Sequence, residues 1–305
     1  MSTAIMTSEA ERAQLRASTP SFFGIVRGEL LKMSRRWSTW IPLVVVIMFL
    51  CAGILIRLTN SELKQAINAN QLSFLYVEME NGLAFIRIFT GLYFLVLVAY
   101  VIGLEYQMGT IRVLIARGVG KVTLLLAKLT SILVVALLVI IGCMLLTAGL
   151  ICVVLLSATG NLDALKTLTS QFWSDTGLYL LTVLISTVIT ILLGTMLSVL
   201  GRSLTIGLSA GLAWFPVDNI GSQFLSLAYR VTHNDFWQNV TAYFLGPNLN
   251  VMVSQIMPAK LGVEGVGIPP LVKVDGPHTL WVVLVYGLVF LVVSIALTAT
   301  RDITE

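Results

Sequence analysis

Long blocks of consecutive apolar residues dominate this chain and determine the elements that it predicts. Crossing about 30 Å of hydrocarbon takes roughly 20 apolar residues in a helix, which satisfies its backbone hydrogen bonds internally. The pattern therefore predicts an all-α, polytopic integral membrane protein with six transmembrane helices, and residues 38–305 form one six-span domain. The six predicted spans lie at about residues 38–56, 83–104, 128–156, 176–200, 204–225 and 280–300.

The composition excludes a water-soluble fold. Of the 305 residues, 57% are hydrophobic and only 11% are charged, against roughly 25% charged residues in an ordinary soluble domain. Such a chain lacks the polar side chains to cover its own surface in water. The apolar blocks are therefore interpreted as lipid-embedded helices and not as the cores of soluble domains.

Lys and Arg are spread unevenly over the segments between the spans. With six spans, one side of the membrane holds 11 Lys or Arg in 64 residues, and the other side holds 6 in 99. Cytoplasmic segments carry the excess of positive charge, so both termini are predicted to be cytoplasmic, in a cell membrane such as the bacterial inner membrane. Because the basic residues are divided among membrane-flanking segments, no nucleic-acid partner is expected.

An amphipathic helix is predicted over residues 21–37, between a disordered cytoplasmic tail at residues 1–20 and the first span. Its apolar positions fall within one arc of about 100° on a helical wheel. We expect that arc to lie in the headgroup layer, with the charged residues facing either anionic lipid or a cytoplasmic partner. These charged residues are Arg27, Glu29, Lys32, Arg35 and Arg36.

The cytoplasmic segment between spans two and three, residues 105–122, carries a short amphipathic pattern. Ile111, Leu114 and Ile115 form an apolar face at i, i+3 and i+4, and Gly118 ends the pattern. This predicts a two-turn helix lying across the membrane surface. Its apolar face packs either on a partner protein or on lipid.

Glu105 stands at the cytoplasmic end of the second span, where a carboxylate is costly unless it is paired or hydrated. Arg112 and Lys121 follow in the same segment, and an ion pair with either would fix the angle between the span and the segment. The alternative is an ordinary end residue whose carboxylate reaches the water. The sequence leaves both open.

The predicted fifth span ends with Pro216, Asp218 and Asn219. Proline removes a helical hydrogen bond, and polar side chains at such a break either line a wet cavity or cap the outer end of the span. We treat these three residues as a candidate transport-pathway element. The long outer loop at residues 226–279 has apolar residues at helical spacing, which predicts short outer or re-entrant helices before the last span.

No cofactor is predicted in this chain. The two histidines, His233 and His278, are far apart in the sequence and have no neighbouring ligands of the kind that metal sites use. The nearest approach to a phosphate-binding loop, residues 118–123, lacks the upstream glycine and has a valine after its lysine, so it is interpreted as a turn. The chain is therefore not expected to be an enzyme.

A pattern between the second and third spans carries a family resemblance. An acidic residue ends one span, and a Gly-Thr pair, a short apolar run, a basic turn and a lysine entering the next span follow it. The residues are Glu105, Gly109, Thr110, Leu114, Lys121, Leu125 and Lys128. With six spans and the basic helix over Arg27–Trp37, the chain resembles permease subunits of ABC transporters, specifically the six-span type 2 exporter group. It departs from members that have a proline where Gly118 stands.

The resemblance implies that residues 107–120 form a coupling helix, which sits in a cleft of a separate nucleotide-binding subunit. ATP and Mg²⁺ would be bound by that ATPase partner, and a second permease subunit, identical or related, would complete an exporter that works by alternating access. The residues expected to couple the two subunits are Glu105, Gly109, Thr110, Arg112, Ile115, Arg117 and Lys121.

Other classes of membrane protein remain open from the residues alone. An intramembrane enzyme needs converging catalytic groups at span depth, whereas Glu105 and Asp218 lie at opposite faces in the predicted topology. An ion-driven secondary transporter usually carries buried charges in related halves, and no internal repeat is evident here. A non-transporting scaffold or assembly protein is the main alternative.

Overall fold

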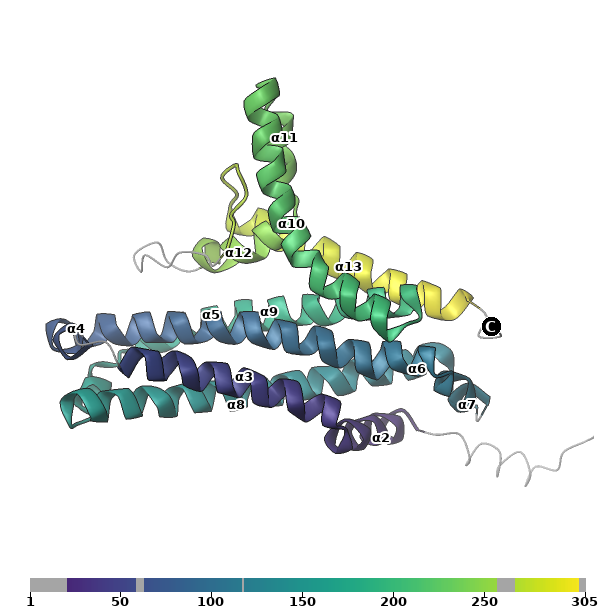
Figure 1. The fold of residues 1–305 in the computed structure, drawn as a ribbon, viewed down its shortest axis with the longest axis horizontal. Coiled ribbons are helices and arrows are strands. Elements are labelled where there is room, and N and C mark those ends of the chain that lie inside the picture. The colour runs from purple at the N-terminus through teal and green to yellow at the C-terminus, as the bar shows by residue number, and fades with distance from the viewer. Residues whose placement is uncertain (1–20, 59–62, 117, 257–266, 302–305) are drawn as a thin grey trace, which may run out of the picture.

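The computed structural model describes residues 21–58, 63–116, 118–256 and 267–301, and the regular elements within these ranges are all helical (Figure 1). The first half contains α2 (Phe22–Arg35), α3 (Trp37–Leu58), α4 (Leu63–Ala69), α5 (Gln71–Val98), the π-helical η1 (Ala99–Gly103), α6 (Leu104–Gln107), α7 (Thr110–Ala116) and α8 (Lys121–Thr159). The second half contains the 3-10 helix η2 (Asp163–Thr167), α9 (Ser170–Gly201), α10 (Leu204–Thr232), α11 (Phe236–Thr241), α12 (Leu245–Ile256) and α13 (Gly276–Thr300).

Five of the described helices are long and apolar enough to cross a membrane, which is the pattern of a multi-pass membrane protein. They are α3, the continuous helix formed by α5, η1 and α6, and α8, α9 and α13. These five match five of the six predicted spans. At about 1.5 Å per residue, each of the five is long enough to cross the roughly 30 Å of a hydrocarbon core. We infer that the longest two extend well beyond it.

The sixth predicted span, residues 204–225, lies in α10, which is not among these five helices. The first half of α10 is apolar, but Pro216, Asp218 and Asn219 fall within its second half. In Figure 1, α10 follows α13 at first, bends in its middle and then leads away from the bundle. Proline removes a backbone donor and commonly causes such kinks. The six-span plan therefore stays a prediction.

The helix that contains the second span begins earlier than predicted. α5 starts at Gln71 and not near residue 83, so most of the predicted outer loop at residues 57–82 is helical. Polar side chains interrupt the apolar pattern in the first part of α5, so the pattern did not predict a helix there. In the structure, two of these side chains have partners on other helices. Glu78 pairs with Arg57 of α3 at 3.4 Å, and the Tyr76 hydroxyl donates to Asp175 of α9 at 2.9 Å.

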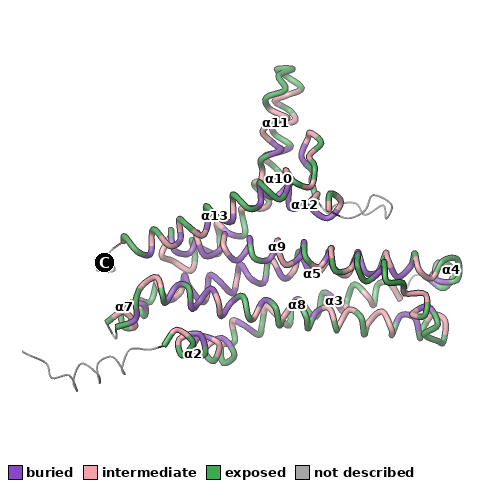
Figure 2. The backbone as a smooth tube through the Cα atoms, turned by 180° about the vertical axis from the view of Figure 1, so that it is seen from behind, coloured by how far each residue is buried: buried purple, intermediate pink, exposed green. Residues whose placement is uncertain are grey.

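α3, α5, α8 and α9 run side by side, and α13 packs against α9 (Figure 1). The largest apolar core lies between α5, α8 and α9 and includes Phe94, Val98, Ile132 and Val183. In Figure 2, the buried residues concentrate along α5 and α9, and exposed residues run along α3 and the far part of α10. We call the end of the bundle that holds α2, α6, α7 and residue 301 the connector end.

α2 confirms the predicted amphipathic helix, and part of its apolar face packs on this chain. The Ser21 hydroxyl accepts from the Gly24 amide at 3.1 Å and caps the first turn, and an extended Arg36 ends the helix before Trp37 starts α3. Val26, Glu29 and Met33 are buried, and α2 contacts α8. Part of the apolar stripe that was expected to lie in the headgroup layer therefore packs on α8. The predicted tail, residues 1–20, lies outside the described residues.

Candidate functional site

A buried cluster of charged side chains lies at the connector end, where α2, α6 and α8 meet. The Lys128 ammonium is 2.7 Å from Glu29 Oε2 and 2.7 Å from Glu105 Oε2. Lys128 is only 1% exposed, and both carboxylates are buried as well. Lys32 Nζ completes the cluster at 2.7 Å from Glu29 Oε1 and 3.3 Å from Glu105 Oε1. We call Glu29, Lys32, Glu105 and Lys128 the ion cluster.

The ion cluster joins three elements that are distant in the sequence. Glu29 and Lys32 belong to α2, Glu105 belongs to α6, and Lys128 belongs to α8. Moving a charge out of water costs several kcal/mol, which is recovered only while the opposite charges stay in place. Any motion that separates the three elements would leave a buried charge unpaired. The cluster therefore holds α2, α6 and α8 together as one unit.

The pKa values of the two cluster residues on α2 show how strongly the charged forms are stabilised. Burial acts to raise the pKa of Glu29, but the ammonium groups of Lys128 and Lys32 outweigh it and lower the pKa below 4.5. Burial acts to lower the pKa of Lys32, but Glu29 and Glu105 outweigh it and raise the pKa above 10.5. Both side chains are therefore charged at neutral pH.

The predicted partners of Glu105 were wrong. Its carboxylate pairs with Lys128 and Lys32, and with Arg36 at 3.7 Å, instead of Arg112 or Lys121. The alternative of a water-exposed end residue was also wrong, because Glu105 is only 4% exposed. The chain turns directly after α6 and leaves Arg112 exposed. Lys121 Nζ donates instead to the Arg301 carbonyl at 3.1 Å.

The connector, which we define as residues 104–120, confirms the predicted two-turn helix. Gly109 and Gly118 adopt left-handed backbone angles, with φ of +67° and +87°, at the two ends of α7, and a side chain would strain either position. The Val119 amide donates to the Leu114 carbonyl at 3.3 Å, which is the hydrogen bond of a glycine-terminated helix end. The Thr110 hydroxyl donates to the Glu105 carbonyl at 3.3 Å. Arg117 lies outside the described residues.

The apolar face of α7 packs on this chain itself. Ile111 is buried against Val119 and Leu124, and Ile115 and Ile25 pack against the same cluster. The predicted contact of this face with a partner or with lipid, Ile115 included, is therefore not what the structure shows. The outward surface of the connector is formed by other residues. Met108 is 69% exposed, Val113 is 53% exposed, and Arg112 is also exposed.

The connector is tied to further helices at the same end of the bundle. The Gln107 side-chain oxygen accepts from the Leu204 amide at the start of α10, at 3.1 Å. A Cβ atom on Gly103 would lie 2.9 Å from the Ser203 carbonyl oxygen, so only a glycine lets the two backbones approach this closely. Lys121 binds the end of α13 through Arg301, whose guanidinium donates to the Leu200 carbonyl at 3.0 Å.

The predicted pathway residues belong to a second polar cluster, between α5, α10 and α12. Asn219 Oδ1 accepts from Asn250 Nδ2 at 2.8 Å, and Arg87 Nη1 donates to the Leu249 carbonyl at 2.7 Å. The Asp218 carboxylate accepts from the Gly246 amide. Arg87 lies buried inside α5. We call Arg87, Asp218, Asn219 and Asn250 the amide cluster.

A small cavity of about 170 Å³ adjoins the amide cluster. It is lined by Arg87, Asn219 and Asn250 together with Ser186 and Thr190 of α9. Asp218 does not line it, and its carboxylate instead holds the start of α12. Pro216 is exposed at the bend of α10. The three predicted pathway residues are thus brought to one region, where only Asn219 faces a cavity.

The remaining predicted residues of α2, Arg27 and Arg35, are exposed and lie outside the ion cluster. Among the described residues, no three His, Cys, Asp or Glu side chains are placed so that they would hold a metal ion. Comparison of the chain with protein-family models, with curated proteins and with solved structures found no match. The geometry of the connector end is therefore the basis for the functional proposal.

Proposed function

We propose that this chain is the membrane-spanning permease subunit of an ATP-driven ABC transporter, and that it works as an exporter. The observation that carries the proposal is the connector. Its outward surface, formed by Met108, Arg112 and Val113, stands on an element whose base is fixed by the ion cluster. A short, exposed, rigidly mounted helix of this kind suits the transfer of force from a partner protein to a helix bundle.

The fixed contacts indicate how such a force would spread. A push on α7 moves Glu105, and the ion pairs of Lys128 carry this motion to α8 and α2. The Gln107 hydrogen bond and the close contact at Gly103 carry it to the start of α10. In our proposal, ATP-driven closure of two nucleotide-binding subunits tilts this unit, and the outer part of α10 with α12 responds at the opposite side of the bend. Alternating access follows from that rigid-body motion.

The proposal includes the partners and the location. ATP and Mg²⁺ are bound by separate ATPase subunits, and a second permease subunit, identical or related, completes the transporter. In the proposal, both termini and the connector are cytoplasmic, which the distribution of Lys and Arg supports, and the chain belongs to a cell membrane, such as the inner membrane of a bacterium. The five apolar helices support the membrane location.

The test is co-purification with the ATPase that a neighbouring reading frame encodes, identified by its own phosphate-binding loop. The variant Arg112→Glu combined with Val113→Asp changes the outward surface of the connector and leaves its buried face intact. We expect the amount of co-purified ATPase to fall at least tenfold. Arg27→Glu, an exposed change on α2, is the control and should retain it.

The opposite outcome is equally clear. If the connector variant co-purifies with as much ATPase as the wild-type chain does, the coupling role of α7 is contradicted. A chain whose genomic neighbourhood encodes no ATPase, and which co-purifies with none, would instead be a membrane scaffold. In reconstituted vesicles, the proposal also requires that the ATPase subunit hydrolyses ATP faster with the wild-type chain than with the connector variant.

A further inference from the structure

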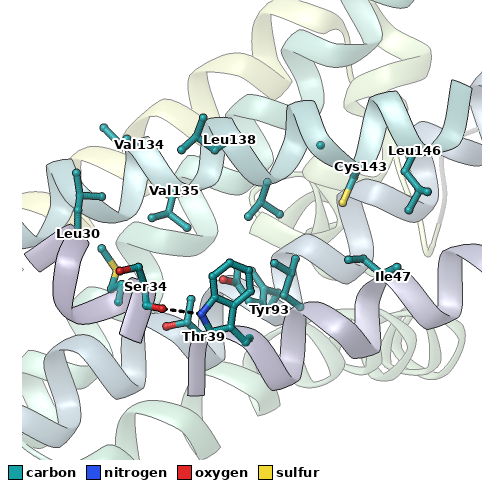
Figure 3. Close-up of a pocket in the computed structure, with 15 residues that line it drawn as sticks. Leu30, Ser34, Thr39, Ile47, Tyr93, Val134, Val135, Leu138, Cys143 and Leu146 are labelled. Atoms are coloured by element: carbon teal, nitrogen blue, oxygen red, sulfur yellow. Dashed lines mark hydrogen bonds between the residues drawn. The ribbon is translucent and has the colours of Figure 1, made fainter. Parts of the chain in front are cut away.

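A large apolar groove opens between α2, α3 and α8 (Figure 3). Its volume is about 700 Å³, which is within the range of small-molecule sites. The walls are aliphatic and include Leu43 and Ile47 of α3 and Val135, Leu138 and Leu146 of α8. Very few polar atoms face it, so its occupant must be mostly hydrocarbon.

Two hydroxyl groups at one part of this groove have no hydrogen-bond partner among the described residues. Thr39 Oγ1 and the Tyr93 hydroxyl are both buried, with the residues 7% and 2% exposed. Both residues line the groove, and Figure 3 labels them among its lining side chains. An unpaired buried hydroxyl is destabilising, because no hydrogen bond replaces the ones it would make with water. A ligand that accepts two hydrogen bonds at this level would remove that cost.

The groove is long and begins at the membrane interface. One end is formed by Leu30, Met33 and Ser34 of the amphipathic helix α2. Along α8 the lining runs from Val134 to Leu146, which is about 18 Å at the helical rise of 1.5 Å per residue. A ligand that fits has a polar group at the α2 end and a single extended hydrocarbon chain beyond it.

The charge near the α2 end favours an anionic polar group. Arg35 follows the lining residue Ser34, is exposed and makes no ion pair with any described residue. Lys32, one turn earlier, is paired with Glu29 and Glu105, so the exposed positive charge at this surface comes from Arg35. An exposed Arg beside an apolar groove attracts anionic lipid headgroups.

We propose that this groove binds one anionic phospholipid of the leaflet that faces α2. One acyl chain lies between α3 and α8, the ester oxygens accept hydrogen bonds from Thr39 and Tyr93, and the headgroup phosphate is near Arg35. The bound lipid fills the gap beside α3, which is the least buried of the five candidate spans. This site does not depend on the proposed transport function, because it requires only that the chain lies in a membrane.

The test uses the full chain in nanodiscs with a phosphatidylglycerol probe that carries a photoactivatable diazirine on its acyl chain. Gly142 lines the groove, and a Cβ atom there meets nothing within 4 Å, so Gly142→Phe fills the groove without a clash at its base. Gly149 lies two turns later on α8 and also has open space around its Cβ position. Gly149→Phe is therefore the matched control.

We expect cross-links in the wild-type chain to map to residues 39–47 and 134–146, and to fall at least fivefold in Gly142→Phe but not in Gly149→Phe. Thr39→Val combined with Tyr93→Phe should lower the yield severalfold. In the wild-type chain, a phosphatidylcholine analogue of the probe should give a lower cross-linking yield than the phosphatidylglycerol probe. In Arg35→Gln, the yields of the two probes should be equal. Cross-links that are spread evenly over the lipid-facing helices, or that persist in Gly142→Phe, would overturn the proposal. An equal yield with the two headgroups would overturn its anionic part.

Discussion

The ion cluster and the amide cluster are two places where polar side chains connect the helices of this apolar protein, and they do so by different means. The ion cluster joins α2, α6 and α8 through largely buried ion pairs at 2.7 to 3.3 Å. The amide cluster joins α5, α10 and α12 through a hydrogen bond between the neutral side chains of Asn219 and Asn250 and through hydrogen bonds from the Arg87 guanidinium. We expect the ion pairs to hold their helices in one arrangement and the Asn219–Asn250 bond to permit rearrangement.

The difference follows from the energy of the separated state. Breaking a buried ion pair leaves a charge without a partner and costs about 3 to 5 kcal/mol. Hydrogen bonds between membrane helices average about 0.6 kcal/mol, because the released groups find other partners. In α10, the buried residues are only Gly207, Gly211 and Ser222. We therefore expect the connector end to move as one body and α10 with α12 to adjust.

The largest effect should come from removing the ammonium at the centre of the ion cluster. Lys128→Met leaves Glu29 and Glu105 buried without their main partner. We expect the free energy of unfolding to fall by about 3 to 5 kcal/mol. Denaturant unfolding of the purified chain in mixed micelles, followed by tryptophan fluorescence, measures this.

The control separates lost charge from lost packing. In the triple variant Lys128→Met, Glu29→Gln and Glu105→Gln, no carboxylate is left unpaired, so more than half of the lost stability should return. A triple variant as unstable as Lys128→Met alone would show that packing, and not charge, holds α2, α6 and α8 together. The comparison between the two clusters would then fail.

The next effect concerns the contact between the connector end and α10. Gly103→Ala places a methyl group 2.9 Å from the Ser203 carbonyl oxygen and 3.1 Å from the Leu204 Cα, and we expect it to cost about 1 to 3 kcal/mol. Gly91→Ala is the matched control on the same continuous helix, because its nearest neighbour is 3.9 Å away. That variant should be neutral or slightly stabilising. Equal unfolding free energies for the two variants would contradict the close approach of α10.

A smaller effect is expected in the amide cluster. In a double-mutant cycle of Asn219→Ala and Asn250→Ala, the coupling energy should be about 1 kcal/mol, in the range of membrane hydrogen bonds. The same unfolding assay measures it. A coupling energy as large as the loss in Lys128→Met would mean that the amide cluster is as rigid as the ion cluster. The proposed difference between the two regions would be wrong in that case.

The sequence predicted the membrane helices well because hydrocarbon imposes a simple requirement of length and apolarity. Five spans were found at about the correct positions. The errors come from polar residues whose partners lie far away in the sequence. The start of α5 was missed because Glu78 looks like a loop residue until it is placed beside Arg57. The bend of α10 was indicated by Pro216, but its direction depends on packing.

The candidate site was predicted only in part, for the same reason. Glu105 was recognised as costly and in need of a partner, yet no local pattern connects it to Lys128 or to Lys32. The apolar face of α7 was recognised, but its packing on Leu124 of the same chain was not. A signal for Lys128 was present, because its charge stands beside a long apolar run.

The last prediction is the smallest effect, an absence of pH dependence over a wide range. The folded pKa of Glu29 lies below 4.5, so its stabilisation is present above pH 4.5 and is lost as the pH falls through the lower folded value. The folded pKa of Lys32 lies above 10.5, so its stabilisation is present below pH 10.5 and is lost as the pH rises through the higher folded value. Between about pH 5 and 9, the difference in unfolding free energy between the wild type and Glu29→Gln should therefore stay constant.

Asp163→Asn, an equal charge change at an exposed site, is the control for general charge effects. A difference that already shrinks between pH 7 and 5 would mean that burial outweighs Lys128 at Glu29, and that the ion cluster does not hold its charges as firmly as the comparison requires.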